Sequence, residues 1–368
     1  MRLEGAGEMS PRERVKNLIS GRSVDYFPSQ LDFTPRVALN LASEKGISED
    51  EFYRSIENHI MYAHTLGNVE EYMQDDDLLA HGIELGFATW DTEKDIVYDR
   101  FGVGWDRRAE GVFVREYPLA DLGNYSQYHF PTIENDQIMC RAKETVEKYK
   151  DEFYLVGFQH IGLFERAWAI RGYENLMVDF YAHPELVEEI LDNVLQYKLQ
   201  EAEYFIKVGV DCVRTGDDWG TQANLAISPD LWRRFIKPRQ ERLWRRYMDA
   251  GMPIMHHSCG NIESIIPDLI EIGLDVLHPV QPRAMCLEKL SRLYSEKIIF
   301  FGGIDTQYLL PYGRPEEVKA AVKDCVELFR AGRGYIIAPS QEIMSDVPVG
   351  NIMALVESIR EYRTLWRQ

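Results

Sequence analysis

A histidine and a cysteine that lie one position apart are the residues of this chain best suited to chemistry. His257 and Cys259 occur in the stretch GMPIMHHSCGNIESII, at the end of a short apolar run and before a Gly-Asn turn. If residues 253–256 form a β-strand, both side chains project to the same side just beyond its C-terminal end. A thiolate and an imidazole can together bind one soft cation such as Zn2+. The alternative is an ordinary strand end with a buried cysteine.

A zinc site needs three or four ligands, so other residues must complete such a pair. The candidates in the sequence are Gln281, Gln341 and Glu342, although a glutamine oxygen is a weak zinc ligand. Asp217 and Asp218 could bind the metal, orient a ligand histidine or cap the helix that follows, and we favour the last two roles. We also predict that His160, with these two aspartates, orients groups around the site.

The rest of the chain predicts a set of alternating strands and helices that would bring these residues together. After helices at about 10–19 and 50–65, the predicted strands are 25–33, an uncertain one near 80–100, then 153–157, 210–214, 253–256, 276–278, 298–301 and 335–338. Helical stretches separate them, which is typical of a parallel sheet, and the total of eight predicts a (β/α)8 TIM barrel with an N-terminal helical extension. Active sites in this fold lie at the C-terminal ends of the strands, where all the candidate residues occur.

Composition and charge limit the possible partners and the location of the protein. The chain has 368 residues, 45% hydrophobic and 27% charged, and a net charge of −19. This acidity argues against nucleic acid and anionic membrane surfaces as partners. No apolar run is long enough to span a membrane, and no signal region is evident, so we expect a cytoplasmic protein. Its five cysteines are scattered, which argues against a disulfide framework.

Two further stretches and the domain boundaries complete these expectations. Residues 1–9 are predicted to be a loose tail, and residues 10–368 a single domain. The acidic cluster at 75–77 is interpreted as a helix cap or a solvated turn rather than a metal site. The stretch VYDRFGVGWDRR at 97–108 is typical of a hairpin or a loop near the mouth of a site.

Four segments resemble the uroporphyrinogen decarboxylase superfamily: GVDCVRTGDDWGTQ, HHSCGNIESIIPDLIEIGLDVLHPVQP, FFGGIDTQYLLPYGRPEEV and DVPVGNIMALVE. The resemblance covers about residues 9–365 and implies a (β/α)8 barrel with one of two chemistries. The zinc methyltransferases of this superfamily carry His-x-Cys at one strand end, matched here by His257 and Cys259, and a further cysteine near the last strand. That cysteine corresponds to Gln341 here. In the more distant zinc methionine synthases, a glutamate ligand falls at about Gln281.

The resemblance to true decarboxylases is weaker at the residues that would bind substrate. Those enzymes hold several substrate carboxylates with arginines in a segment after the first strand. The corresponding segment here, SQLDFTPRVALNLA, has Arg36 alone beside Asp32 and Thr34. Because bidentate arginine–carboxylate pairing is hard to replace, a substrate with four carboxylates would find little neutralising charge.

These observations support three hypotheses. The leading one is a corrinoid-dependent methyltransferase that moves a methyl group from a methylated corrinoid, free or on a partner protein, to a thiol activated by Zn2+. Trp219 and Tyr335 are then candidates to flank the flat corrinoid. The second is a decarboxylase in which Asp217 or Asp218 stabilises a protonated intermediate. The third is a corrinoid-binding protein without catalysis, suggested by Gln341 in place of the cysteine.

Overall fold

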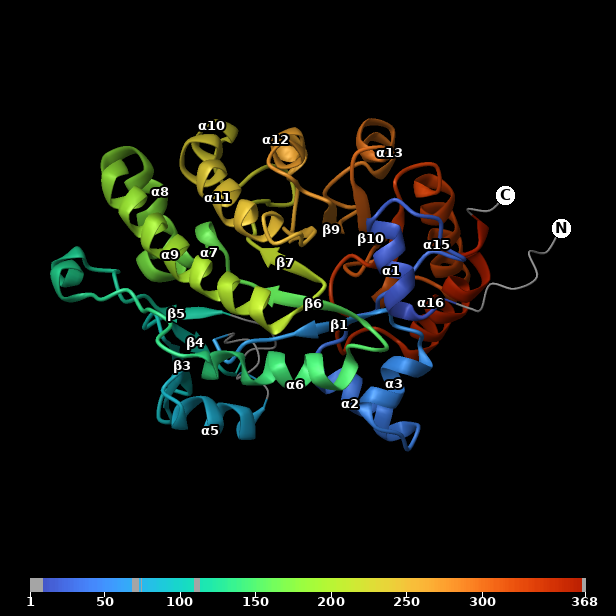
Figure 1. Ribbon diagram of the computed structural model, residues 1–368, viewed down its shortest axis with the longest axis horizontal. Helices are drawn as coiled ribbons and strands as arrows, with labels where there is room; N and C mark the ends of the chain where they lie inside the picture. Colours follow the sequence, from blue (N-terminus) through green and yellow to red (C-terminus); the bar gives the residue numbers. More distant parts are fainter. Residues whose placement is uncertain (1–8, 68–72, 74, 109–112, 366–368) are drawn as a thin grey trace.

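A parallel β-sheet forms the centre of the computed structural model, which describes residues 9–67, 73, 75–108 and 113–365 (Figure 1). The sheet has seven strands in the order β1-β6-β7-β8-β9-β10-β11. Their bounds are β1 Ile60–Ala63, β6 Tyr154–Gln159, β7 Cys212–Gly216, β8 Ile254–His257, β9 Val276–Val280, β10 Ile299–Ile304 and β11 Tyr335–Pro339. The predicted α/β class with a parallel sheet is therefore confirmed.

The segment around Ser29 lies between the two edges of this sheet. On one side it bridges to Ile337 of β11, whose N–H donates to the carbonyl oxygen of Pro28 at 2.9 Å. On the other side the carbonyl oxygen of Ser29 accepts the N–H of His59, the residue before β1, at 3.2 Å. The predicted first strand at 25–33 thus pairs through isolated bridges at Ser29 and Phe33 rather than as a continuous strand.

The strand predicted near residues 80–100 is wrong as a member of this sheet. Those residues form the end of helix α5, Asp76–Glu84, and the antiparallel strands β2, Ala88–Asp91, and β3, Ile96–Asp99. With β4, Gly104–Asp106, and β5, Val114–Glu116, they make a separate four-stranded sheet. The parallel strand at this point is β1, which the sequence analysis placed inside a helix because four apolar residues in a row fit either element.

The two other predictions for this region are confirmed. Strands β3 and β4 pair as an antiparallel hairpin within residues 97–108. Asp75 caps α5, because its side chain accepts the N–H of Leu78 at 2.9 Å. Figure 1 shows the antiparallel sheet on the side of the molecule toward which β1 and β6 point.

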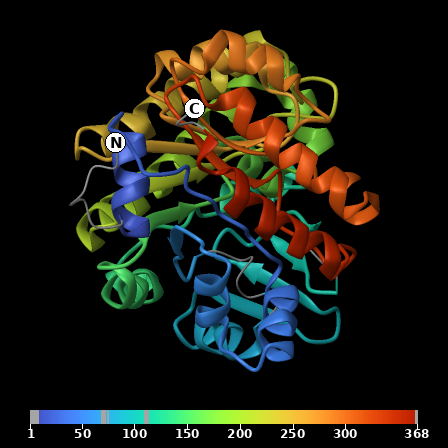
Figure 2. The same ribbon diagram turned by 90° about the vertical axis from the view of Figure 1, so that its right-hand side faces the viewer.

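Helices cover the outside of the parallel sheet, as the turned view in Figure 2 shows. The larger ones are α1 Pro11–Ile19, α2 Pro35–Glu44, α3 Glu49–Ser55, α6 Cys140–Tyr149, α7 Leu163–Arg171, α8 Tyr173–Ala182, α9 Pro184–Val208, α11 Lys237–Met248, α13 Leu287–Tyr294, α15 Pro315–Phe329 and α16 Val349–Tyr362. Shorter ones are α10 Pro229–Leu231, α12 Ile266–Glu271 and α14 Leu309–Tyr312, and a π-helical turn, Trp232–Ile236, joins α10 to α11. Helix α1 begins at a capping box formed by Ser10 and Glu13. Of the expected tail, residues 1–8 lie outside the described part of the chain.

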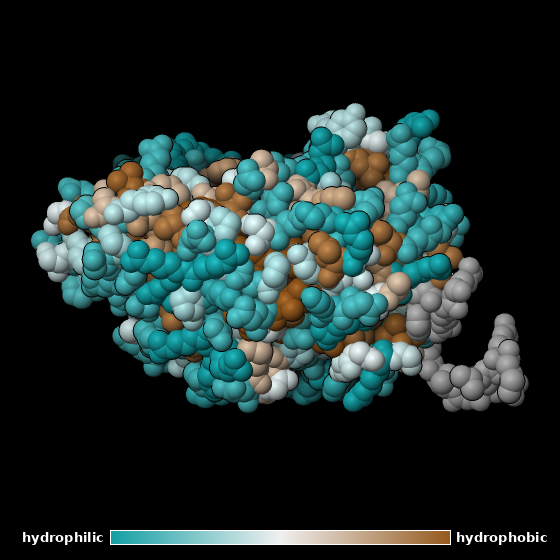
Figure 3. Space-filling model, turned by 90° about the horizontal axis from the view of Figure 1, so that it is seen from above, coloured by the Kyte–Doolittle hydropathy of each residue, from teal (hydrophilic) through white to brown (hydrophobic). Residues whose placement is uncertain are grey.

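The strands of the parallel sheet are almost fully buried. In Figure 3, hydrophilic residues cover most of the face seen from above, and hydrophobic ones appear in small separate groups. No helix in the described part of the chain has the length and apolar character required to cross a membrane. All five cysteines are free thiols.

Candidate metal centre

Strand β8 directs its two consecutive histidines to opposite faces of the sheet. The ring of His256 stacks on Trp219 with 4.3 Å between ring centroids, and its Nδ1 lies 2.8 Å from Thr215 Oγ1. His257 points to the other face, where its ring meets that of His160 edge to face at 5.3 Å. The alternation expected for a strand thus turns only His257 toward the site.

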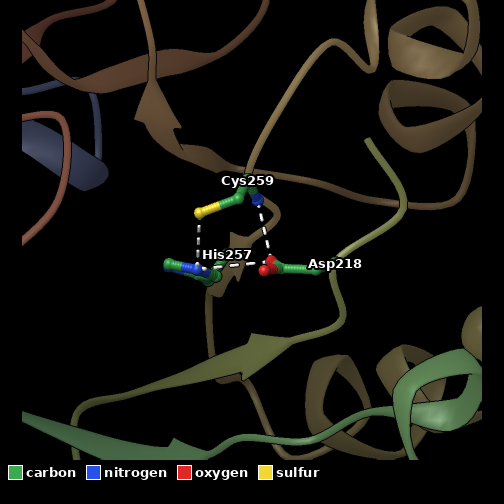
Figure 4. Close-up of side chains that lie close together, drawn as sticks. All are labelled: Asp218, His257 and Cys259. Atoms are coloured by element: carbon green, nitrogen blue, oxygen red, sulfur yellow. Dashed lines mark hydrogen bonds and ion pairs between the residues drawn. The ribbon is translucent and has the colours of Figure 1, made fainter. Parts of the chain in front are cut away.

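Three side chains converge where strands β7 and β8 end (Figure 4). His257 Nε2 lies 3.5 Å from Cys259 Sγ and 3.4 Å from Asp218 Oδ1. Zinc bonds of about 2.3 Å to sulfur and about 2.0–2.1 Å to nitrogen or oxygen, in a tetrahedral arrangement, place such ligand atoms about 3.4–3.6 Å apart. The two distances from His257 Nε2 therefore match those of a zinc site, and all three ligand atoms lie within 4.8 Å of one another.

Two glycines bring the loops that carry Asp218 and Cys259 into contact. Gly260 has φ +80°, and a Cβ added there would lie 2.4 Å from the carbonyl carbon of Gly220. The backbone N–H of Cys259 donates to Asp218 Oδ1 at 2.8 Å, which ties the two loops together at the cluster. A side chain at either glycine would separate the loops and with them the ligand atoms.

The second ring nitrogen of His257 faces another buried histidine. His257 Nδ1 lies 2.9 Å from His278 Nδ1, and the two residues are paired in the register of β8 and β9. Burial lowers the pKa of both histidines, so both rings are neutral near pH 7. With a cation at Nε2 in place of its proton, the remaining proton on His257 Nδ1 would be donated to His278 Nδ1. The sequence analysis missed His278, although it stands at the end of the neighbouring predicted strand.

Burial and neighbouring groups perturb the two acidic members of the cluster in opposite directions. Burial tends to raise the pKa of Asp218, but the contacts with His257 and with the Cys259 N–H outweigh it and hold this pKa below its usual range. Burial and the negative charge of Asp218 raise the pKa of the Cys259 thiol. Asp218 is thus ionised and ready to bind a cation, whereas Cys259 must lose a proton to do so.

The two glutamines predicted as metal ligands both present their amide nitrogens to the cysteine sulfur. Gln341 Nε2 lies 3.3 Å and Gln281 Nε2 lies 3.6 Å from Cys259 Sγ. The carbonyl oxygen of Gln281 is already used, because it accepts the N–H of Gly260 at 2.6 Å. Both amides therefore donate a hydrogen bond to the cysteine sulfur, and neither presents its oxygen as a ligand beside that sulfur. Glu342, the remaining candidate, is exposed at the edge of the site.

Asp217 is fully buried and caps helix α7 rather than facing the cluster. Its carboxylate accepts the N–H groups of Phe164 at 2.9 Å and Glu165 at 2.8 Å, and the indole N–H of Trp219 at 2.8 Å. Burial raises its pKa to about 6 despite these donors. The sequence analysis expected the aspartates to cap the helix that follows them, but Asp217 caps α7, which precedes it in the chain, and Ser228 caps the following helix α10. Asp218 joins the possible ligands.

Glu165 is a further acidic residue near the cluster, and the sequence analysis did not identify it. Burial, followed by the charge of Asp218, raises its pKa to about 8, so the carboxyl group is largely protonated at neutral pH. It lies in the first turn of α7, a position with no motif in the sequence to reveal it.

The two aromatic residues proposed to flank a corrinoid are both fully buried. Trp219 packs between His256 and Trp232, and Tyr335 donates its hydroxyl to the carbonyl oxygen of Gly302 at 2.5 Å. Neither ring has an exposed face for a flat ligand. Their predicted contact with a corrinoid therefore finds no support in their positions.

A cleft of about 560 Å³ opens beside Cys259. The loops that follow β7, β8, β9, β10 and β11 supply its walls, with the C-terminal ends of the strands below, as expected for this class of fold. The lining residues are Gly220, Thr221, Gln222, Cys259, Gly260, Gln281, Thr306, Gln307, Gln341, Glu342, Met344 and Asp346. This volume suits a small molecule that reaches the cysteine from solvent.

Comparison with known proteins relates the chain to two groups of enzymes. The sequence model of the family described as "Uroporphyrinogen decarboxylase (URO-D)" matches residues 96–362. The methylcobamide:CoM methyltransferase MtbA of Methanosarcina mazei is 24% identical over 67% of this chain and 69% of its own length. A uroporphyrinogen decarboxylase of Thermus thermophilus is 28% identical over 48% of each chain. Among solved structures, a methyltransferase from Methanosarcina mazei covers 96% of this chain and 99% of its own, with a TM-score of 0.66 and 19% identity, and so shares the fold.

Proposed function

The chain belongs to the uroporphyrinogen decarboxylase family, and from this membership and the candidate metal centre we propose that it is a zinc-dependent methyltransferase. In this proposal the methyl donor is a methylated corrinoid, free or held by a partner protein, and the acceptor is a small thiol. The observation that carries the proposal is the convergence of His257, Cys259 and Asp218, within 4.8 Å of one another, beside an open cleft. We further propose that the segment at Ser29 takes the place of the eighth strand of a (β/α)8 barrel.

Each member of the site has a distinct part in this proposal. His257 Nε2, Cys259 Sγ and Asp218 Oδ1 would hold Zn2+, and the acceptor thiol would enter from the cleft. Zinc held by these residues would lower the pKa of the acceptor thiol, so that it would be a thiolate near pH 7, with its proton released to solvent through the cleft. The thiolate sulfur would then take the methyl group from the donor, with the electron pair of the broken methyl–cobalt bond left on cobalt.

The surrounding residues keep the ligands in their reactive form. His278 fixes the His257 tautomer by accepting the Nδ1 proton. The amides of Gln281 and Gln341 donate to the cysteine sulfur and so stabilise its thiolate. His160, whose ring meets His257 edge to face, limits the rotation of that ring. In this proposal Asp217 positions α7 and the loop that carries Asp218.

Metal analysis of matched cysteine variants tests this proposal. Cys259→Ala removes the sulfur at the cluster, whereas Cys286→Ala removes an exposed thiol that precedes α13. We expect about one zinc ion per chain in the wild type and in the Cys286 variant, and almost none in the Cys259 variant. Equal zinc content in all three proteins would overturn the metal site.

The methyl-transfer step needs its own assay. Zinc-loaded protein is mixed with methylcobalamin and a thiol without oxygen, and loss of the methyl–cobalt absorbance is followed. Cys286→Ala should react at the wild-type rate, and Cys259→Ala should not react. Release of CO2 from uroporphyrinogen by metal-free protein would instead establish the decarboxylase alternative. The exposed position of Arg36, the one arginine of the segment after Ser29, gives that alternative no carboxylate clamp.

A further inference from the structure

The charges around the cleft beside Cys259 carry information about the molecule that enters it. Among the described residues that line the cleft, none is lysine, arginine or histidine. Two are carboxylates, Glu342 and Asp346, and four are glutamines, at positions 222, 281, 307 and 341. The walls can therefore donate and accept hydrogen bonds, but they present net negative charge.

Two arginines close in sequence to residues of this site, Arg214 in β7 and Arg283 after Gln281, have acidic partners of their own. Arg214 is buried below the site, where it contacts the Tyr62 hydroxyl at 2.8 Å and Asp32 at 3.8 Å. Arg283 lies 4.0 Å from Asp305, just outside the cleft. Neither guanidinium lines the cleft, but Arg214 interacts electrostatically with Glu342, so Asp346 is the carboxylate whose charge an entering ligand would chiefly meet.

Asp346 lines the cleft from the loop between β11 and α16, which also carries Gln341 and Glu342. Its side chain is exposed to the cleft, and no salt bridge involving it occurs among the described residues. A small ligand whose sulfur meets the cluster would thus bring its other end near carboxylate and amide groups. An anionic end would be repelled there and a cationic end attracted, because charges within a few ångströms interact strongly in a partly enclosed site.

We propose that the acceptor taken by this cleft is a small thiol whose far end is neutral or cationic, with an ammonium group bound best, and that thiols ending in a sulfonate or carboxylate are disfavoured. This inference rests on the proposed function for the identity of the reacting group. It sets this chain apart from the CoM methyltransferases to which it is similar, because coenzyme M carries a sulfonate.

Three thiols of equal length test the proposal: 2-mercaptoethanesulfonate, 2-mercaptoethanol and 2-aminoethanethiol. Their binding to the zinc-loaded protein is measured by calorimetry, and their methylation by methylcobalamin is measured in parallel. We expect the aminothiol to bind at least about tenfold more tightly than the sulfonate, a difference that shrinks at high salt. The three thiols differ in intrinsic acidity, so the comparison is made between protein variants.

Asp346→Asn removes one carboxylate of the cleft, and Asp324→Asn makes the same charge change at an exposed position on α15. The ratio of aminothiol to sulfonate affinity should fall about threefold or more in the first variant and stay unchanged in the second. A wild-type protein that binds the sulfonate as tightly as the aminothiol, or an unchanged ratio in Asp346→Asn, would overturn the inference, as would the absence of any binding. Selective binding without methylation would reject the proposed reaction while supporting the assigned ligand class.

Discussion

Substitutions of the neighbouring residues Asp217 and Asp218 should have different effects, the first on the free energy of unfolding and the second on zinc binding. Asp217→Ala leaves three buried donors without an acceptor: the N–H groups of Phe164 and Glu165 and the indole of Trp219. At about 1–3 kcal/mol for each buried donor left unsatisfied, the summed loss is roughly 3–9 kcal/mol. Removing a buried charge also removes its desolvation cost, so we expect the lower end, about 3–4 kcal/mol.

Asp218→Ala should instead lose zinc binding and little stability. It leaves the Cys259 N–H without its acceptor and removes the contact with His257 Nε2, but the Asp218 side chain is 37% exposed, so water can replace the lost oxygen. We expect a loss of about 1 kcal/mol or less in the free energy of unfolding, but zinc content close to none. The Asp217 variant should retain zinc for as long as it is folded.

Urea denaturation of the metal-free proteins, followed by circular dichroism, gives the stabilities, and elemental analysis gives the zinc content. If Asp217→Ala does not fold, Asp217→Asn keeps one acceptor oxygen and should show a smaller loss in the same direction. The reasoning is refuted if Asp217→Ala is as stable as the wild type, or if Asp218→Ala binds zinc with wild-type affinity.

Two further pairs of variants test the packing around the site. The Cβ of Gly260→Ala would lie 2.4 Å from backbone, so this variant should lose about 2 kcal/mol or more in the free energy of unfolding and bind zinc at least about tenfold more weakly. Gly251 also has a positive φ, +77°, but nothing lies within 4 Å of its added Cβ, so Gly251→Ala should lose only about 1 kcal/mol and bind zinc unchanged. Equal zinc affinities in the two variants would contradict this. Lys198→Met should cost about 3–5 kcal/mol in urea denaturation, because it leaves the buried carboxylate of Glu201 without the ammonium 3.0 Å away. The double variant Lys198→Met/Glu201→Leu should recover most of that loss, and a double variant no more stable than the single one would contradict it.

The second half of the fold could be predicted from the sequence because its strands follow a regular rhythm. Each buried apolar run there is bounded by turn residues and separated by an amphipathic helix, and strands β6 to β11 fall where these runs predicted them. The first half has no such rhythm. The four residues of β1 follow helix α3 closely, and their pairing with β6 is decided by contacts with residues almost a hundred positions away.

The candidate site could be predicted in part for a similar reason. The period of a strand placed His257 and Cys259 on one side, and the structure brings them together at 3.5 Å. The different roles of Asp217 and Asp218 depend on the side of the turn to which each carboxylate points. No sequence pattern reveals that direction. His278 and Glu165 are close to the cluster only through the pairing of β9 with β8 and the packing of α7 on the Asp217 loop.

Asp218, the third possible ligand, differs in chemistry from the further cysteine that the resembling zinc methyltransferases carry. A His/Cys/Asp set carries the same formal charge as a His/Cys/Cys set, because a carboxylate replaces a thiolate, so it neutralises Zn2+ equally well. Oxygen is a harder and less electron-donating ligand than sulfur, which leaves the metal a stronger Lewis acid toward an incoming thiol. At the position that corresponds to that cysteine, Gln341 donates to the sulfur of Cys259, and this contact would withdraw further electron density from a metal bound there. Under the proposed function, both changes favour activation of the incoming thiol.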